Sequence, residues 1–323
     1  MVSLNNNSQH GPIFVVSGLS RCGTTLLRLM LTAHSRISIP PESTFIHRLL
    51  QNNLDERTII NDSNRQCFLD IVWDEKDLKL PEWRLDRNEI DKKLRAMGEI
   101  PLADAIAEVY WAYAKKCHPD ADVWGDKNPA YLWDMDAIRK IFPDARFVVI
   151  VRDIRDVYLS MFKVNSSNCW NIRNITNVWN EVIDLIENSV ADDHVAFLKY
   201  EELLTNPETE LQKVCDFLNL EFEASMLQYH TMNKQKELVP HSRVEWGHQN
   251  TLSPVMKNNF NKWARELAPE RIELIECFST KQLERMGYQK QFQGRRLSTN
   301  ALILLMNNFS RLAWMRLTGK NVR

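Results

Sequence analysis

The residues of this chain best suited to chemistry lie in the segment 17–25, which reads SGLSRCGTT and follows an apolar run. A loop between a strand and a helix exposes successive backbone N–H groups, and the helix N-terminus adds its positive dipole end. The glycines of this segment match those of a P-loop, but Thr24 stands where a P-loop has its lysine. The segment therefore predicts an anion site that takes its positive charge from Arg21. Its expected contributors are Arg21, Cys22, Gly23, Thr24 and Thr25.

A second candidate anion site follows the apolar run 146–151, which reads RFVVIV. Arg152 comes directly after this run. A guanidinium can bind two phosphate oxygens at once. Arg152 could instead form a structural ion pair with Asp153 or Asp156. We favour phosphate binding, because a buried parallel strand delivers the residue after it to the ligand edge of the sheet.

Apolar runs alternate with segments of helical spacing, which predicts an α/β fold with a P-loop-like parallel sheet flanked by helices on both faces. Ligands bind such sheets at the carboxyl ends of the strands. A cation or a hydroxyl is expected at four of these ends, namely Arg21, Lys127, Arg152 and Tyr200. The expected strands are 12–17, 36–39, 123–126, 146–151 and 194–198, and the expected helices include 207–218 and 269–285.

The composition narrows the class of protein. Lys plus Arg (41) nearly balance Asp plus Glu (42), which argues against a non-specific nucleic-acid binder. The six cysteines are widely spaced and form no C-x-x-C pair, so we expect neither a zinc site nor a disulfide frame, and a cytoplasmic location. No stretch approaches the roughly 18 apolar residues of a membrane span.

Three ordered motifs give the chain a resemblance to a known family: SGLSRCGTTLL, then RFVVIVRDIRDVYLS, then FLKYEELLTNPETELQKVCDFLNLEF. Together they resemble the sulfotransferases that use 3′-phosphoadenosine 5′-phosphosulfate (PAPS), and most of all bacterial members of the broad family that includes the tyrosylprotein sulfotransferases. The resemblance covers about residues 12–50 and 124–288. Two positions depart from the family pattern: Cys22 replaces a more usual serine, and Ser253 stands where animal tyrosylprotein sulfotransferases have a basic residue.

The resemblance implies PAPS as co-substrate and assigns its binding residues. The loop residues Arg21, Gly23, Thr24 and Thr25, with the backbone at Cys22, would hold the 5′-phosphosulfate. Arg152 and Ser160 would hold the 3′-phosphate, and Tyr200 would lie near the nucleotide.

The resemblance also implies the catalytic residues. Glu42 falls on the position of the family's catalytic glutamate, and Lys127 falls on that of a lysine near the transferring group. We therefore expect a metal-independent, in-line transfer in which Glu42 takes a proton from an acceptor hydroxyl, while Arg21 and Lys127 stabilise the leaving group. Glu42 could instead be a plain first-turn carboxylate. His47 and Asp126 are reserve bases, whereas His241 and His248 are expected to be ordinary loop histidines.

The expected organisation is a disordered tail (1–10), one sulfotransferase domain (11–290) with a helical acceptor-side insertion (51–120), and a C-terminal helical extension (291–323). The last helix of that extension could touch a membrane surface, but docking onto the domain is the preferred interpretation. The acceptor could be a carbohydrate, a lipid, a small metabolite or a peptide tyrosine. Two other functions remain open, a P-loop kinase or NTPase and a non-catalytic nucleotide-binding module.

Overall fold

A five-stranded sheet forms the centre of the computed structural model, which describes residues 11–74, 80–164, 171–189, 191–292 and 296–306. The strand order is β2-β5-β1-β6-β7, and every neighbouring pair is parallel. The strands are β1 (Ile13–Val16), β2 (Ile37–Ser38), β5 (Val123–Lys127), β6 (Arg146–Val151) and β7 (Val195–Lys199). The five predicted strands and the predicted parallel sheet are thus confirmed. The predicted tail and the end of the C-terminal extension lie outside the described residues.

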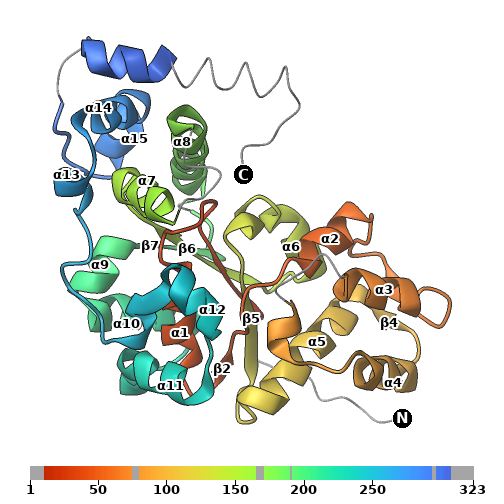
Figure 1. The fold of residues 1–323 in the computed structure, drawn as a ribbon. Coiled ribbons are helices and arrows are strands. Elements are labelled where there is room, and N and C mark those ends of the chain that lie inside the picture. Colours follow the sequence, from red (N-terminus) through yellow and green to blue (C-terminus); the bar gives the residue numbers. More distant parts are fainter. Residues whose placement is uncertain (1–10, 75–79, 165–170, 190, 293–295, 307–323) are drawn as a thin grey trace.

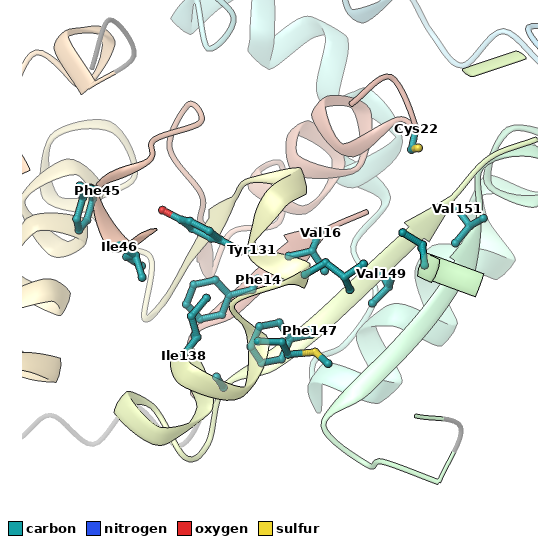
Figure 2. Close-up of a cluster of buried hydrophobic side chains, with 14 of the residues drawn as sticks. Phe14, Val16, Cys22, Phe45, Ile46, Tyr131, Ile138, Phe147, Val149 and Val151 are labelled. Carbon is teal, nitrogen blue, oxygen red and sulfur yellow. The ribbon is translucent and has the colours of Figure 1, made fainter. Parts of the chain in front are cut away.

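The central strand β1 is buried on both faces because all four of its residues are apolar. Phe14 and Val16 point into one apolar cluster, and Ile13 and Val15 point into another on the opposite face. Figure 2 shows the first cluster, in which Phe14 stacks on Phe147 of β6 with ring centroids 5.2 Å apart. An unbroken apolar run is typical of a parallel strand that is covered on both sides.

Helices cover both faces of the sheet (Figure 1). One face packs against α1 (Thr24–Thr32), α9 (Tyr200–Thr205), α10 (Pro207–Leu218) and α11 (Tyr229–Lys236). The other face packs against α6 (Met135–Ile141), α7 (Ile154–Lys163), α8 (Ile172–Asn188), α14 (Pro269–Phe278) and α15 (Thr280–Arg285).

Residues 51–120 gather next to β5 (Figure 1). They contain α3 (Arg65–Val72), α4 (Arg87–Met97), α5 (Leu102–Cys117), the 3₁₀ turn Leu80–Trp83, and a small antiparallel pair of β3 (Ile59–Ile60) and β4 (Ile100–Pro101). The helix α2 (Phe45–Gln51) packs against α3.

The chain after α11 is less regular than the sequence pattern indicates. The expected helix 269–285 is divided at Ser279 (φ −123°, ψ 18°), which separates α14 from α15. Before them lie α12 (His241–Arg243), a π turn (Val244–His248), a 3₁₀ turn (Gln249–Leu252) and α13 (Trp263–Glu266). Among the described residues, none of the helices combines the length and apolar character needed to cross a bilayer.

Candidate active site

Residues with positive φ determine the shape of the loop between β1 and α1. Gly18 donates its N–H to the carbonyl of Pro129 (2.8 Å), and Arg21 has a positive φ of 71°. Gly23 precedes α1 with φ 104°, and a Cβ at this position would lie 2.4 Å from Cδ2 of Tyr200. Only glycine therefore permits both this φ and the close approach of the Tyr200 ring.

The Arg21 guanidinium joins the loop to two distant segments. Its Nε donates to Oγ of Ser160 on α7 (3.1 Å), and its Nη2 donates to the carbonyl of Gly247 (2.7 Å). Burial and the neighbouring Arg152 guanidinium lower the pKa of Arg21. Two cations placed side by side in a partly buried site favour the binding of an anion between them.

Arg152 follows β6 and is 9 % exposed. Its guanidinium stacks over the Tyr200 ring (4.4 Å to the centroid), and its Nη1 donates to the carbonyl of Arg21 (3.2 Å). Of the two alternative ion-pair partners, Asp153 binds Arg155, and Asp156 lies 3.9 Å from Arg152 Nη2. The Nε of Arg152 is buried with no hydrogen-bond partner in the described part of the chain. A ligand oxygen would satisfy this donor.

These groups face one cavity of about 210 Å³, which we call the Arg152 cavity. It also takes in Lys163 and Lys262, so its walls are rich in positive charge. The structure thus brings together seven of the predicted binding residues in its lining: Arg21, Gly23, Thr24, Thr25, Arg152, Ser160 and Tyr200.

The three predicted catalytic residues line a second cavity of about 250 Å³, the Glu42 cavity: Glu42, Lys127 and Arg21. Nζ of Lys127, at the end of β5, lies 2.5 Å from Oε2 of Glu42. Lys127 is 4 % exposed, and it is positioned by the strand that pairs with β1. The walls of the Glu42 cavity include Arg28, Pro41, Glu82, Pro129, Leu238 and Arg243.

The remaining predicted residues are not in the lining of either cavity. The Cys22 side chain is buried in the core, which raises the pKa of its thiol to about 12, so only its backbone could serve a ligand. Asp126 is fully buried and accepts the Tyr110 hydroxyl (2.5 Å). His47 lies 2.7 Å from Asp134. The two reserve bases therefore lie away from the cavities.

The segment after α12 contributes individual residues that the sequence pattern does not identify. His248 lines both cavities, although the sequence pattern suggests an ordinary loop histidine. Asn259 donates its Nδ2–H to the Tyr200 hydroxyl (3.1 Å), and its carbonyl accepts from Arg152 Nη2 (3.4 Å). No local sequence pattern predicts these contacts, because each joins residues that are far apart in the chain.

A metal site is not evident in the part of the chain that the structure describes: no group of three or more His, Cys, Asp or Glu side chains could hold an ion there. The metal-independent mechanism stays a prediction.

Comparisons with known proteins point to one family. Residues 12–224 match the model of a sulfotransferase family. A protein-tyrosine sulfotransferase of Drosophila melanogaster is 24 % identical over 263 residues, which cover 79 % of this chain and 48 % of that protein. Protein-tyrosine sulfotransferase 1 of Danio rerio is 24 % identical over 283 residues, which cover 86 % of this chain and 72 % of that protein. The chain therefore spans about half the length of the Drosophila relative.

Two solved structures share the fold. The sulfotransferase domain from the curacin biosynthetic pathway superposes with a TM-score of 0.56 at 20 % identity, covering 87 % of this chain and 99 % of that domain. The sulfotransferase domain of the Synechococcus PCC 7002 olefin synthase gives a TM-score of 0.56 at 20 % identity, covering 88 % and 98 %. At this identity the likeness concerns the fold alone.

Proposed function

Since this chain belongs to the sulfotransferase family, we propose that it transfers the sulfuryl group of PAPS to an acceptor hydroxyl. One observation carries the proposal. The Arg152 cavity and the Glu42 cavity meet at the loop after β1, because Arg21, Thr24 and Thr25 line both. A donor in one cavity and an alcohol in the other would meet beside this loop.

The Arg152 cavity suits a donor with two anionic ends. Arg152 and Ser160 would bind the 3′-phosphate, and the buried Nε of Arg152 supplies a donor that lacks a partner in the described part of the chain. Arg21 and the amides at the start of α1 would bind the 5′-phosphosulfate. An anion between Arg21 and Arg152 would also offset the burial and the repulsion from Arg152 that lower the pKa of Arg21.

The Glu42 cavity suits the acceptor. Glu42 would take the proton of the acceptor hydroxyl as the acceptor oxygen forms its bond to sulfur. The bond between sulfur and the 5′-phosphate oxygen breaks, and the phosphate leaves with the electron pair. Arg21 and Lys127 would stabilise the charge of the leaving phosphate. By analogy with phosphoryl transfer, catalysis depends mainly on alignment and on charge stabilisation.

The acceptor class remains the open part of this proposal. Protein-tyrosine sulfotransferases among the relatives support a phenol hydroxyl. Apolar side chains such as Pro41, Pro129 and Leu238 could contact the body of such a group. A carbohydrate, a lipid or a small metabolite remains an alternative acceptor.

Two measurements test the function. Calorimetry should show that adenosine 3′,5′-bisphosphate binds without Mg²⁺ and that Mg-ATP does not compete with it. Incubation of the protein with ³⁵S-labelled PAPS and a cell extract should then yield a labelled product. Binding of Mg-ATP alone would favour a kinase. Binding of the bisphosphate with no labelled product from any extract would favour a non-catalytic module.

The role of Glu42 has its own test. Glu42→Gln keeps the shape of the side chain and removes its basicity, so we expect the rate of label transfer to fall by about 100-fold or more. Binding of adenosine 3′,5′-bisphosphate should be unchanged, which controls for folding. Full transfer by this variant would remove Glu42 from the base role.

A further inference from the structure

His248 occupies a distinctive position among the described residues. It lines the Arg152 cavity and the Glu42 cavity, as do Arg21, Thr24 and Thr25. Arg21 belongs to the loop after β1 and Thr24 and Thr25 begin α1, whereas His248 ends the π turn Val244–His248. A second, independent segment therefore reaches the junction of the two cavities, and it contributes an imidazole there.

The backbone on both sides of His248 is held in place. Arg21 Nη2 donates to the carbonyl of Gly247 (2.7 Å), and Thr251 Oγ1 donates to the carbonyl of His248 (2.6 Å). Gly247 has φ 139°, and a Cβ there would lie 2.9 Å from Val164 Cγ1 and 3.1 Å from Arg21 Nη2. Glycine at 247 thus lets the chain approach Arg21 closely, and this approach places His248 beside the loop.

Charged groups from four segments of the chain shift the pKa of the His248 imidazole. Burial lowers the pKa of His248 to about 3, and three cations act in the same direction: Arg21 in the loop after β1, Lys127 on β5, and Arg243 on α12. Glu42, in the segment before α2, opposes them. The imidazole is therefore neutral at pH 7, with one N–H donor and one nitrogen acceptor.

Resting on the proposed function, we propose that His248 is a catalytic residue that hydrogen-bonds the transferring sulfuryl group where the two cavities meet. The sulfuryl group must pass from the Arg152 cavity to the Glu42 cavity, and His248 faces both. Charge develops on the sulfuryl and leaving oxygens in a loose transition state. An imidazole N–H at this junction could donate to these oxygens and stabilise that charge.

The proposal has a consequence for protonation. A bound donor brings negative charge next to Arg21 and offsets the field of the three cations. The charged form of His248 becomes less unfavourable, so binding raises the pKa of the imidazole. His248 should take up a proton as the donor binds, and its imidazolium would then be the stronger hydrogen-bond donor.

Proton NMR of the histidine C2–H resonances in the full chain tests this consequence, with His248 assigned by its loss in His248→Gln. Without ligand, His248 should not titrate between about pH 5 and pH 9. With saturating adenosine 3′,5′-bisphosphate, its titration midpoint should move up into that range. Binding of the bisphosphate with no movement of the His248 midpoint would overturn the proposal. No binding at all would instead contradict the proposed function.

Transfer kinetics give the second readout. His248→Gln keeps an N–H donor but cannot be charged, so label transfer at saturating PAPS should fall about 10- to 100-fold. The affinity for adenosine 3′,5′-bisphosphate should change less than about threefold, because Arg21, Arg152 and Ser160 remain. His241→Gln is the matched control, since His241 is an exposed histidine on neighbouring α12. Parent rates in both His248→Gln and His248→Ala, which has no side-chain donor, would show that His248 does not contact the reacting group.

Discussion

The contacts of Arg152 require an arginine rather than a lysine. Arg152 is nine-tenths buried and stacks on the Tyr200 ring. It also donates one hydrogen bond to the carbonyl of Arg21 in the loop after β1. A planar guanidinium can stack on an aromatic face while its edge binds phosphate oxygens, whereas an ammonium cannot do both. The geometry at this residue therefore depends on the shape of the cation as well as on its charge.

Arg152→Lys should weaken the binding of adenosine 3′,5′-bisphosphate at least about tenfold, although the charge is kept. The matched control is Arg146→Lys at the other end of β6, where Arg146 lies over the Phe217 ring away from both cavities. That variant should bind as the parent does. Isothermal calorimetry on the three proteins measures the difference. Equal affinities for the parent and Arg152→Lys would exclude Arg152 from the nucleotide site.

The buried carboxyl of Asp126 should give the protein an unusual pH dependence of its unfolding free energy. Burial raises the pKa of its carboxyl to about 7 from an ordinary value of 3.8. Between these values the folded state binds a proton that the unfolded state has released, so stability falls as pH rises from about 4 to about 7. The loss amounts to at most about 4 kcal/mol.

Asp126→Asn should remove this contribution. Urea unfolding at pH 5 and pH 8 should show a smaller loss of unfolding free energy for the variant than for the parent. Asp193→Asn, at a carboxylate whose side chain is 96 % exposed, should behave as the parent does. An identical pH dependence in Asp126→Asn and the parent would show that Asp126 is ionised throughout this range.

Individual residues of the site differ in how far the sequence reveals them. Arg21 and Arg152 were predictable because each follows a strand in a local strand-to-helix motif, whereas Ser160 was expected from the family resemblance. The roles of Glu42 and Lys127 were also expected only from that resemblance, and their contact was not predicted, since 85 positions separate them. His248 was missed because its position depends on a hydrogen bond between Arg21 and Gly247, 226 positions apart.

At the scale of elements, the turn into α1 depends on Gly23. Gly23→Ala would combine a strained φ with a clash against the Tyr200 ring. We expect a loss of about 2–4 kcal/mol in unfolding free energy, together with weaker bisphosphate binding. Gly287→Ala is the control, because Gly287 has φ 72° with open space around it, in the hydrogen-bonded turn that ends α15, and should lose only about 1–2 kcal/mol. Urea unfolding compares the two, and equal losses would contradict the role of the Tyr200 contact.

The elements themselves were predictable where local pattern determines them. β6 was recognised from its apolar run, and α10 was recognised with its observed bounds because Pro207 begins it. The stretch 241–252 was not predicted, since its turns depend on tertiary bonds such as that from Arg21 to Gly247. The break at Ser279 was also missed, because serine is compatible with a continuing helix.

At the scale of the whole molecule, Arg155 connects the sheet to the C-terminal helices. It is 1 % exposed and binds Asp153 after β6 and Glu276 on α14. Its guanidinium also lies 3.7 Å from the centroid of the Trp263 ring on α13. Two buried carboxylates thus share one cation, and this network fixes the position of the segment that carries Asn259 and Trp263.

Arg155→Met should destabilise the protein by about 3–5 kcal/mol, because it leaves these buried carboxylates without their cation. Arg285→Met, which breaks exposed pairs with Asp184 and Glu187, should cost less than about 1 kcal/mol. Thermal and urea unfolding measure both. A cost for Arg155→Met as small as that of the control would mean that water or a neighbouring group replaces the buried cation.

The strand order described above has an evolutionary consequence. The central strand β1 lies between two groups of site residues. Arg152, in the Arg152 cavity, follows β6 on one side of β1. Lys127 and Glu42, in the Glu42 cavity, come from β5 and from the segment after β2 on the other side. Mutations on one flank can therefore accumulate without disturbing the other. Under the proposed function, related proteins could change the acceptor alcohol while the residues that would bind the nucleotide stay the same.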